Sequence, residues 1–287
     1  MSAYYRFKHW LKLLRWEARR TIAAQRWGKE CLKQAPVLFG NSMPKSGSHL
    51  IIQMLQGFTR IGPFVNPGFP PVNRAEDNSK LKESEIMANI KRLRSGDIAY
   101  GYLHASDPYF SELKKPGMAS VFIYRDPRDM IVSHVYYATH MNINHGMHRY
   151  YSEVLYTMEE RINAAIQGVG EKGSVITPIK TKYANYLGWL SQVDVLCLRF
   201  EDLILDQESA INKLIDFIAQ RGYLPSIDRE EAIHLIRRSV VPKRSGTFRK
   251  AEPGNWKEHF TETNKSIFKD NTGDLLLELG YEKDCDW

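Results

Sequence analysis

The sequence predicts an α/β protein whose central, mainly parallel sheet is flanked by helices. From residue 36 onward, short apolar runs alternate with helical patterns, and no linker interrupts this alternation. The chain has 287 residues, of which 43% are hydrophobic and 25% are charged, so we expect a sizeable core. We predict an N-terminal helical segment at residues 1–35 and a single α/β domain at residues 36–287.

Residues 1–34 form a basic segment with a helical pattern. They contain nine lysines and arginines but only two acidic residues, Glu17 and Glu30. Phe7, Trp10, Leu11 and Leu14 follow the spacing of an amphipathic helix. Two interpretations stay open. The helix packs on its own domain with a solvated basic face, or it makes a weak contact with an anionic membrane surface or a partner.

Four apolar runs predict the strands of the sheet. The first run, residues 37–40, leads through a glycine-containing turn into a helical pattern at 49–58. Strands joined by helices run parallel, so their carboxyl ends share one edge of the sheet, where α/β proteins bind ligands. The other predicted elements are strands at 98–103, 119–124 and 193–200, a helix through 130–137 and a helix at 208–219.

Composition restricts the class of protein without identifying it. The net charge of +7 suits an anionic ligand, a membrane surface or nucleic acid, and does not choose among them. No apolar run is long enough to span a membrane, and the first residues lack the pattern of a secretory signal. The three cysteines are widely spaced and form no CxxC, which predicts no disulfide framework, no zinc site and a cytoplasmic location. His145 and His148 lack a nearby carboxylate or cysteine, so we expect no metal.

A candidate phosphate site follows the first predicted strand. Lys45 offers a positive charge, Gly47 allows a close backbone approach, and the following helix offers free N–H groups. The competing motif is the Walker A loop, GxxxxGK[ST]. Here Lys45 precedes the glycine instead of following one, which disfavours an ATPase or kinase of that type.

Two further segments carry charges suited to an anion. The third predicted strand leads into Arg125-Asp126-Pro127-Arg128-Asp129, and Ser133 follows two helical turns later, so Arg125 and Ser133 can bind one phosphate together. Arg249 and Lys250 lie in a glycine-containing loop that can close over an anion. Taken singly, each segment is also compatible with a capped helix or a solvated loop.

In their order along the chain, these segments resemble the cytosolic-type sulfotransferase family. Residues 44–47 are similar to its 5′-phosphosulfate loop, and residues 124–129 with Ser133 to its 3′-phosphate motif. Residues 249–257 resemble its RKGxxGDWK segment, and residues 200–203 its YEDL strand end. The resemblance covers about residues 36–282. It implies a P-loop-like sulfotransferase fold and transfer of a sulfuryl group from PAPS (3′-phosphoadenosine 5′-phosphosulfate) to a small-molecule acceptor, releasing PAP. It implies neither a metal nor a nucleic-acid partner.

The resemblance also implies roles for individual residues. His104 matches the family's catalytic histidine, and a histidine suits the removal of an acceptor proton. Lys45 is expected to stabilise charge on the leaving phosphate. His49 is a second histidine near the loop and stays open as an alternative base. The residues expected to bind PAPS are Lys45, Ser46, Gly47, Ser48, His49, Arg125, Ser133, Phe200, Arg249 and Lys250.

The chain departs from the family pattern at several positions. Leu50 replaces a tryptophan that stacks near adenine, Phe200 replaces a tyrosine, and Ala251 replaces a glycine. Tyr102-Leu103 stands where the family has Lys-Thr. The dimer motif is matched only in part, so the oligomeric state is not determined. The acceptor is not determined either, because residues 60–97 and 138–182 are loops of the kind that carry specificity. Two other classes stay open: a P-loop nucleotide phosphotransferase or hydrolase, and a non-catalytic membrane- or partner-binding module.

Overall fold

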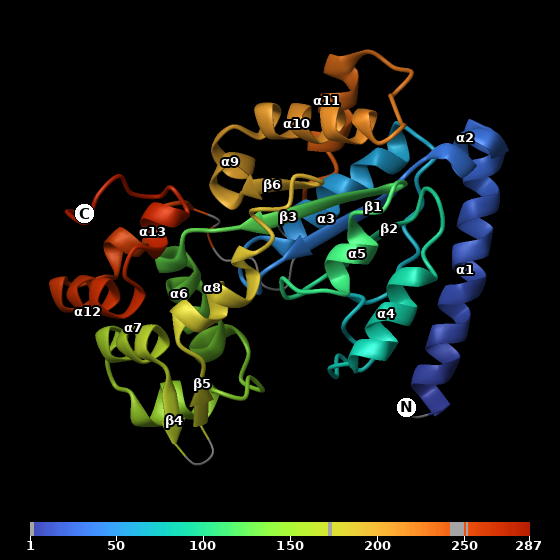
Figure 1. Cartoon of the computed structure of the whole chain (residues 1–287). Helices are drawn as coiled ribbons and strands as arrows, with labels where there is room; N and C mark the ends of the chain where they lie inside the picture. The colour runs from blue at the N-terminus through green and yellow to red at the C-terminus, as the bar shows by residue number, and fades with distance from the viewer. Residues whose placement is uncertain (1–2, 172–173, 242–249, 251) are drawn as a thin grey trace. The chain divides into compact units, whose positions relative to one another are not determined.

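A computed structural model describes residues 3–171, 174–241, 250 and 252–287. The chain divides into two compact units (Figure 1). Unit 1 comprises Met1–Tyr124 and Gly188–Ser245, and unit 2 comprises Arg125–Leu187 and Gly246–Trp287. The predicted boundary at residue 35 does not separate these units, because the N-terminal segment belongs to unit 1.

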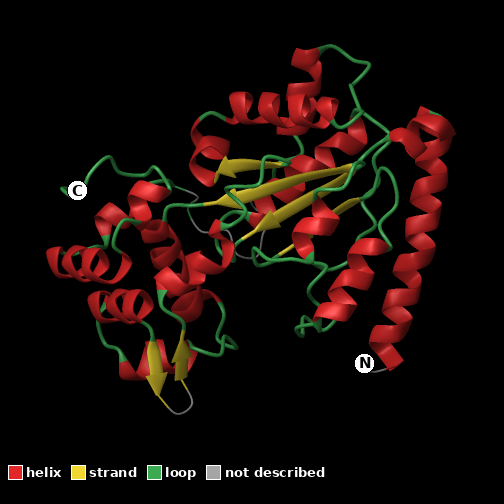
Figure 2. Ribbon diagram, in the orientation of Figure 1, coloured by secondary structure: helices red, strands yellow, loops and turns green. Residues whose placement is uncertain are grey.

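A four-stranded parallel sheet forms the centre of unit 1 in the described residues (Figure 2). Its strands lie in the order β2-β1-β3-β6, and every neighbouring pair is parallel. All residues of β1 are buried, as expected for a parallel strand covered on both faces. The predicted fold class is therefore confirmed. The strands are β1 Val37–Ser42, β2 Ile98–Gly101, β3 Met118–Tyr124 and β6 Val195–Arg199.

Five strand boundaries differ from the prediction by one or two residues: the end of β1, the end of β2, the start of β3 and both ends of β6. β2 ends at Gly101 instead of residue 103, because the Asn41 side-chain amide, not another strand residue, pairs with the backbone of Leu103. β6 ends at Arg199, and Phe200 is the first residue of the next helix. Apolar character continues past the last ladder hydrogen bond in both cases, so periodicity alone extends the strand too far.

Helices cover both faces of this sheet (Figure 1). α3 (Ser48–Gly57) follows β1 directly and packs on β1 and β2 with its buried apolar face. α10 (Gln207–Gln220) is amphipathic and is capped by Asp206, which accepts from Ser209 N. The other helices in the described part of unit 1, after the N-terminal segment, are α4 Glu83–Lys91, α5 Tyr109–Leu113, α9 Phe200–Leu205, α11 Arg229–Arg237 and the 3₁₀-helix η1 Phe58–Arg60.

The N-terminal segment forms α1 (Ala3–Trp27) and α2 (Lys29–Gln34). One side of α1 packs on unit 1 through Trp16 and Ala23, which join a cluster with Leu32 and Val65. The other side remains exposed. In the part of the chain that is described, no helix combines the length and apolar character needed to cross a bilayer.

Unit 2 is mainly helical. α7 (Met158–Gln167) has a capping box in which Thr157 accepts from Glu160 N, and it packs against α12 (Glu262–Thr272). Asn264 of α12 donates to Asn163 of α7 at 2.6 Å. The other described elements are α6 Pro127–Tyr136, the π-helices η2 Tyr137–Met141 and η3 Tyr150–Val154, the hairpin β4 Val169–Glu171 and β5 Ser174–Ile176, α8 Ile179–Leu187, the 3₁₀-helix η5 Asn255–Glu258 and α13 Leu275–Glu278.

Candidate functional site

The loop between β1 and α3 is held by its own backbone and by β3. Ser46 is fully buried, and its hydroxyl donates to Met43 O at 2.7 Å and Ile123 O at 3.2 Å. Lys45 has a φ of 72°, a left-handed conformation that costs roughly 1–3 kcal/mol for a non-glycine residue. Ser46 therefore anchors the loop, and the backbone at Lys45 is strained.

Gly47 is the N-cap of α3 and lies against Phe200. Its φ is 100°, and a Cβ at this position would lie 2.5 Å from Phe200 Cδ2. Glycine is thus required both by the backbone conformation and by the ring beside it. No side chain caps α3 at Gly47, so the N–H groups of its first turn can bind an anion. The tyrosine hydroxyl of the family pattern is lost here, but the aromatic ring remains packed against the loop.

Ser48 and Tyr102 connect the loop to the segment that follows β2. Ser48 Oγ and Tyr102 Oη lie 3.1 Å apart. The next residue, Leu103, pairs with the Asn41 side chain, and its carbonyl also accepts from Trp189 Nε1 at 2.9 Å. The side chains of Asn41 and Trp189 thus fix the backbone of Leu103. His104 follows directly and lies three residues past the end of β2.

Both candidate bases have a lowered pKa. For His104, loss of hydration among neighbouring protein atoms lowers the pKa, and the positive charge of Lys80 lowers it further. For His49, the same loss of hydration lowers the pKa, and Lys45 adds to the effect. Each imidazole is therefore neutral at physiological pH, the form that can accept a proton.

In unit 2, Arg125 lies at the start of a tightly bonded turn. Its side chain is 9% exposed and lies 3.7 Å from the Asp129 carboxylate, while Tyr183 donates to its carbonyl at 2.5 Å. Asp126 caps α6 by accepting from Arg128 N at 2.9 Å. Ser133 lies two turns along the same helix and is half-buried. Arg125 thus lies between the end of β3 and the start of α6, and Ser133 lies within α6; their joint binding of a phosphate stays a prediction.

Arg128 is structural. Its guanidinium pairs with Asp126 and Glu282 and lies 4.0 Å from the ring centroid of Trp256 and 4.5 Å from that of Trp287. Two carboxylates thus pair with the charge of this side chain, and two indole rings lie against its guanidinium. Of the two arginines in the motif, only Arg125 is therefore a candidate for phosphate binding.

Asp129 joins the segment at 124–129 to the backbone at 254–256, a role that the sequence did not reveal. Its carboxylate accepts from Gly254 N and Trp256 N, both at 2.8 Å. Lys250 is exposed and lies 3.3 Å from Glu258 and 3.6 Å from Glu252. Arg249 lies outside the described residues, so its predicted role stays a prediction.

Comparison with known proteins places the chain in a family. The family model described as "Sulfotransferase domain" matches residues 38–280, which include the loop before α3, His104 and the segments at 125–133 and 254–256.

The chain belongs to this sulfotransferase family.

Relatives and solved structures agree with this assignment. A 3-alpha-hydroxysteroid sulfotransferase of Cavia porcellus is 25% identical over 165 residues, covering 52% of this chain and 52% of the relative. The chain therefore spans about half the length of the curated relatives it matches. A mouse sulfotransferase solved with PAP has a TM-score of 0.59 at 14% identity, covering 88% of this chain and 92% of that one. Retinol dehydratase, solved with retinol and PAP, has a TM-score of 0.56 at 13% identity, covering 84% and 82%. At these identities, the two structures establish the fold.

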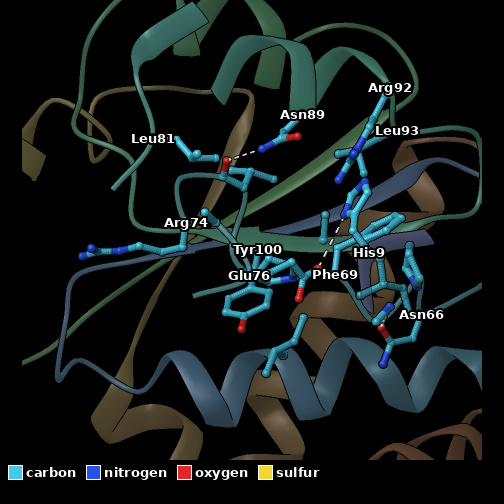
Figure 3. A pocket seen from close by; sticks show the side chains of 18 of the residues that line it. His9, Asn66, Phe69, Arg74, Glu76, Leu81, Asn89, Arg92, Leu93 and Tyr100 are labelled. Carbon is cyan, nitrogen blue, oxygen red and sulfur yellow. Dashed lines mark hydrogen bonds and ion pairs between the residues drawn. The ribbon is translucent and has the colours of Figure 1, made fainter. Parts of the chain in front are cut away.

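In this member of the family, a cavity of ≈ 610 Å³ lies within unit 1 beside α3 and β2 (Figure 3). His49 lines it from α3, Tyr100 from β2, and His9 from α1. Burial raises the pKa of Tyr100 to about 12, so its hydroxyl stays protonated and can donate. Figure 3 shows Arg92 and His9 close to Phe69; the Arg92 guanidinium lies 4.3 Å from the Phe69 ring centroid.

The cavity also contains a buried carboxylate, Glu76, whose side chain is 4% exposed. Lys12 of α1 donates to Glu76 Oε2 at 2.7 Å, and His9 Nδ1 lies 3.6 Å from Oε1. Oε1 itself has no hydrogen-bond partner in the described residues. The cavity therefore combines apolar walls with several charged and polar groups. Among the described residues, no cluster of three or more metal-ligating side chains was found.

Proposed function

We propose that the protein transfers a sulfuryl group from PAPS to a hydroxyl or amine of a small-molecule acceptor, releasing PAP. The observation that carries the proposal is the strained Lys45–Gly47 turn at the start of α3 in a chain whose family is the sulfotransferases. A nucleotide with both a 5′-phosphosulfate and a 3′-phosphate needs two anion sites. Lys45, Ser46, Gly47, Ser48 and His49 are proposed for the first, and Arg125 and Ser133 with Arg249 and Lys250 for the second.

The proposed chemistry is an in-line displacement. A bond forms between the acceptor oxygen or nitrogen and sulfur, while the bond between sulfur and the 5′-phosphate oxygen breaks. The acceptor proton passes to His104, and the electron pair of the broken bond stays on the phosphate of PAP. Lys45 and the N–H groups at the start of α3 stabilise that charge as it develops. His49 is the alternative base, since it lies in the first turn of the same helix.

We further propose that the cavity beside α3 receives the acceptor. It is lined by His49, so it reaches the proposed donor loop, and its volume suits a small molecule. Glu76, Arg92 and Tyr100 favour an acceptor with polar groups over a purely apolar one. We also propose a cytoplasmic location, because Cys31, Cys197 and Cys285 are all free thiols in the structure.

A transfer assay with labelled PAPS tests the function. The protein is incubated with a panel of hydroxyl- and amine-bearing metabolites, and transfer of label is measured. We expect transfer to at least one acceptor and loss of that transfer in Lys45→Ala. Absence of transfer across the panel, together with equal affinity for PAP and ATP, would contradict the proposal and favour a nucleotide phosphotransferase or hydrolase.

A second variant tests the acceptor cavity separately. Ala75 lines the cavity, whereas Ser84 is exposed and does not. Ala75→Trp should raise the acceptor KM about tenfold or more, since the added ring displaces the acceptor, while the KM for PAPS stays unchanged. Ser84→Trp is the matched control and should leave both constants unaltered. Equal acceptor KM values in the two variants would place the acceptor elsewhere.

A further inference from the structure

The outward face of α1 carries a row of exposed apolar side chains. Tyr4, Phe7, Trp10 and Leu14 are spaced three, three and four residues apart, so they lie on one side of the helix. Their exposed fractions are 68%, 59%, 52% and 49%, and Ile22 further along the helix is 62% exposed. Packing within unit 1 does not account for this row, because Trp16 and Ala23 on the other side of α1 make the contact with the core.

Basic residues follow one edge of this apolar row. Lys8, Arg15 and Arg26 repeat at intervals of seven and eleven residues, which places them along one line of the helix surface, and all three are exposed. Glu17, the acidic residue of α1, is already bonded to Arg94 at 2.7 Å. The outward face is therefore apolar with a positive border.

The orientation of this face is fixed by polar contacts on the inner side of α1. Buried Asp97 accepts from Trp16 Nε1 at 2.9 Å and from Arg20 Nη1 at 2.7 Å. Nearer the N-terminus, Lys12 pairs with buried Glu76. Because these anchors oppose rotation of the helix, the apolar row is presented outward before any partner binds, and binding requires no reorientation of α1.

We propose that the outward face of α1 binds an anionic membrane surface. In this arrangement Tyr4, Phe7, Trp10 and Leu14 enter the interfacial layer, and Lys8 and Arg15 contact the lipid phosphates. A second copy of the chain fits this face poorly, since pairing would bring two positive borders together. Nucleic acid offers no apolar phase for the aromatic row. The proposal is independent of the sulfuryl-transfer reaction.

Vesicle co-sedimentation with the full chain tests the proposal. Vesicles of phosphatidylcholine alone are compared with vesicles containing about one third phosphatidylglycerol. We expect binding to the anionic vesicles and at least about tenfold weaker partitioning of Phe7→Ser/Trp10→Ser, because most of the inserted area is removed. The matched control is Val193→Ser/Leu224→Ser, which removes exposed apolar side chains elsewhere in unit 1 and should bind normally.

A charge pair completes the test. Lys8→Glu/Arg15→Glu should also weaken binding at least about tenfold. Lys213→Glu/Arg238→Glu changes the net charge equally at exposed positions outside α1 and should leave binding nearly unchanged. Failure to bind anionic vesicles, equal binding to neutral vesicles, or equal loss in the control variants overturns the proposal. A dimer that Phe7→Ser/Trp10→Ser dissociates, without vesicle binding, assigns the face to a second copy instead.

Discussion

At the scale of single residues, the two histidines of unit 1 differ in how they are held. His104 follows a backbone segment fixed by Asn41 and Trp189. His49 lies in the first turn of α3, directly after the loop, and lines the cavity. Because either imidazole can accept a proton, variants at both positions are needed to identify the catalytic base.

His104→Ala should lower kcat by about 10²–10⁴-fold with PAP affinity nearly intact, because a general base acts only on the chemical step. Lys45→Ala should reduce both kcat and PAPS affinity, since its charge serves the bound and the transition state. Single-turnover assays and calorimetry with PAP measure the two effects. A His49→Ala variant that is inactive beside an active His104→Ala variant would reverse the assignment.

The pH profile gives an independent check. Burial and Lys80 lower the pKa of His104 below its ordinary value of 6.5. The imidazole therefore stays neutral as the pH falls to 6.5, and kcat should decline only at a pH below 6.5. Lys80→Gln removes one cause of this lowering. It should therefore shift the acidic limb to higher pH. Lys82→Gln, at a neighbouring exposed position, is the control and should not shift the limb. An unmoved limb in Lys80→Gln would indicate that the titrating group is not His104.

At the scale of elements, α1 is attached to unit 1 through a buried carboxylate. Asp97 is 0% exposed and accepts from Trp16, Arg20 and the backbone N–H of Arg94. Burial raises the pKa of Asp97, while these donors lower it. The carboxylate is thus the polar centre of the contact between α1 and the residues that precede β2.

Asp97→Ala should destabilise the protein by roughly 3–5 kcal/mol, because it leaves the Arg20 guanidinium and two N–H donors without their acceptor. Chemical denaturation measures the loss. Asp216→Ala, which removes an exposed ion pair with Arg229, is the control and should cost about 1 kcal/mol or less. Similar losses in the two variants would show that Asp97 does not anchor α1.

The Asp129 carboxylate performs a comparable task in unit 2, where it holds the backbone at Gly254 and Trp256. Asp129→Ala should weaken PAP binding about tenfold or more, because the segment after Lys250 loses two charge-assisted hydrogen bonds. Asp129→Asn keeps one acceptor and should have a smaller effect. Calorimetry with PAP measures both, with Asp270→Ala, at an exposed position of α12, as the control. Unchanged PAP affinity in Asp129→Ala would refute the positioning role.

At the scale of the whole molecule, the family model extends over segments of both units, so donor binding should stabilise the chain as a whole. PAP at about one hundred times its Kd should add about 2.7 kcal/mol of stability, whereas ATP at the same concentration should add less. Thermal unfolding with each nucleotide measures this stabilisation.

Arg125→Ala should weaken PAP binding by roughly 2–4 kcal/mol and Ser133→Ala by about 0.5–1.5 kcal/mol. Thermal unfolding of each variant with each nucleotide measures these losses. A fall in 5′-AMP affinity equal to that for PAP would show that Arg125 does not bind the 3′-phosphate.

The sequence by itself determined the order of strands and helices, the loop before α3 and the family. These features are local: apolar runs mark β1 and β3, and the turn at Gly47 and the start of α6 at Pro127 are specified by adjacent residues. Local patterns persist along the chain whatever packs against them, so they can be read from sequence.

Only the tertiary structure decided which residues meet across long separations. It showed that Gly47 faces Phe200, that Asp129 holds the segment at 254–256, and that Arg128 is enclosed by two tryptophans. It also divided α1 into a face that packs on Asp97 and a face that stays exposed. A helical repeat reveals that a helix has two sides, but which side meets the core depends on partners about eighty residues away, as between Trp16 and Asp97.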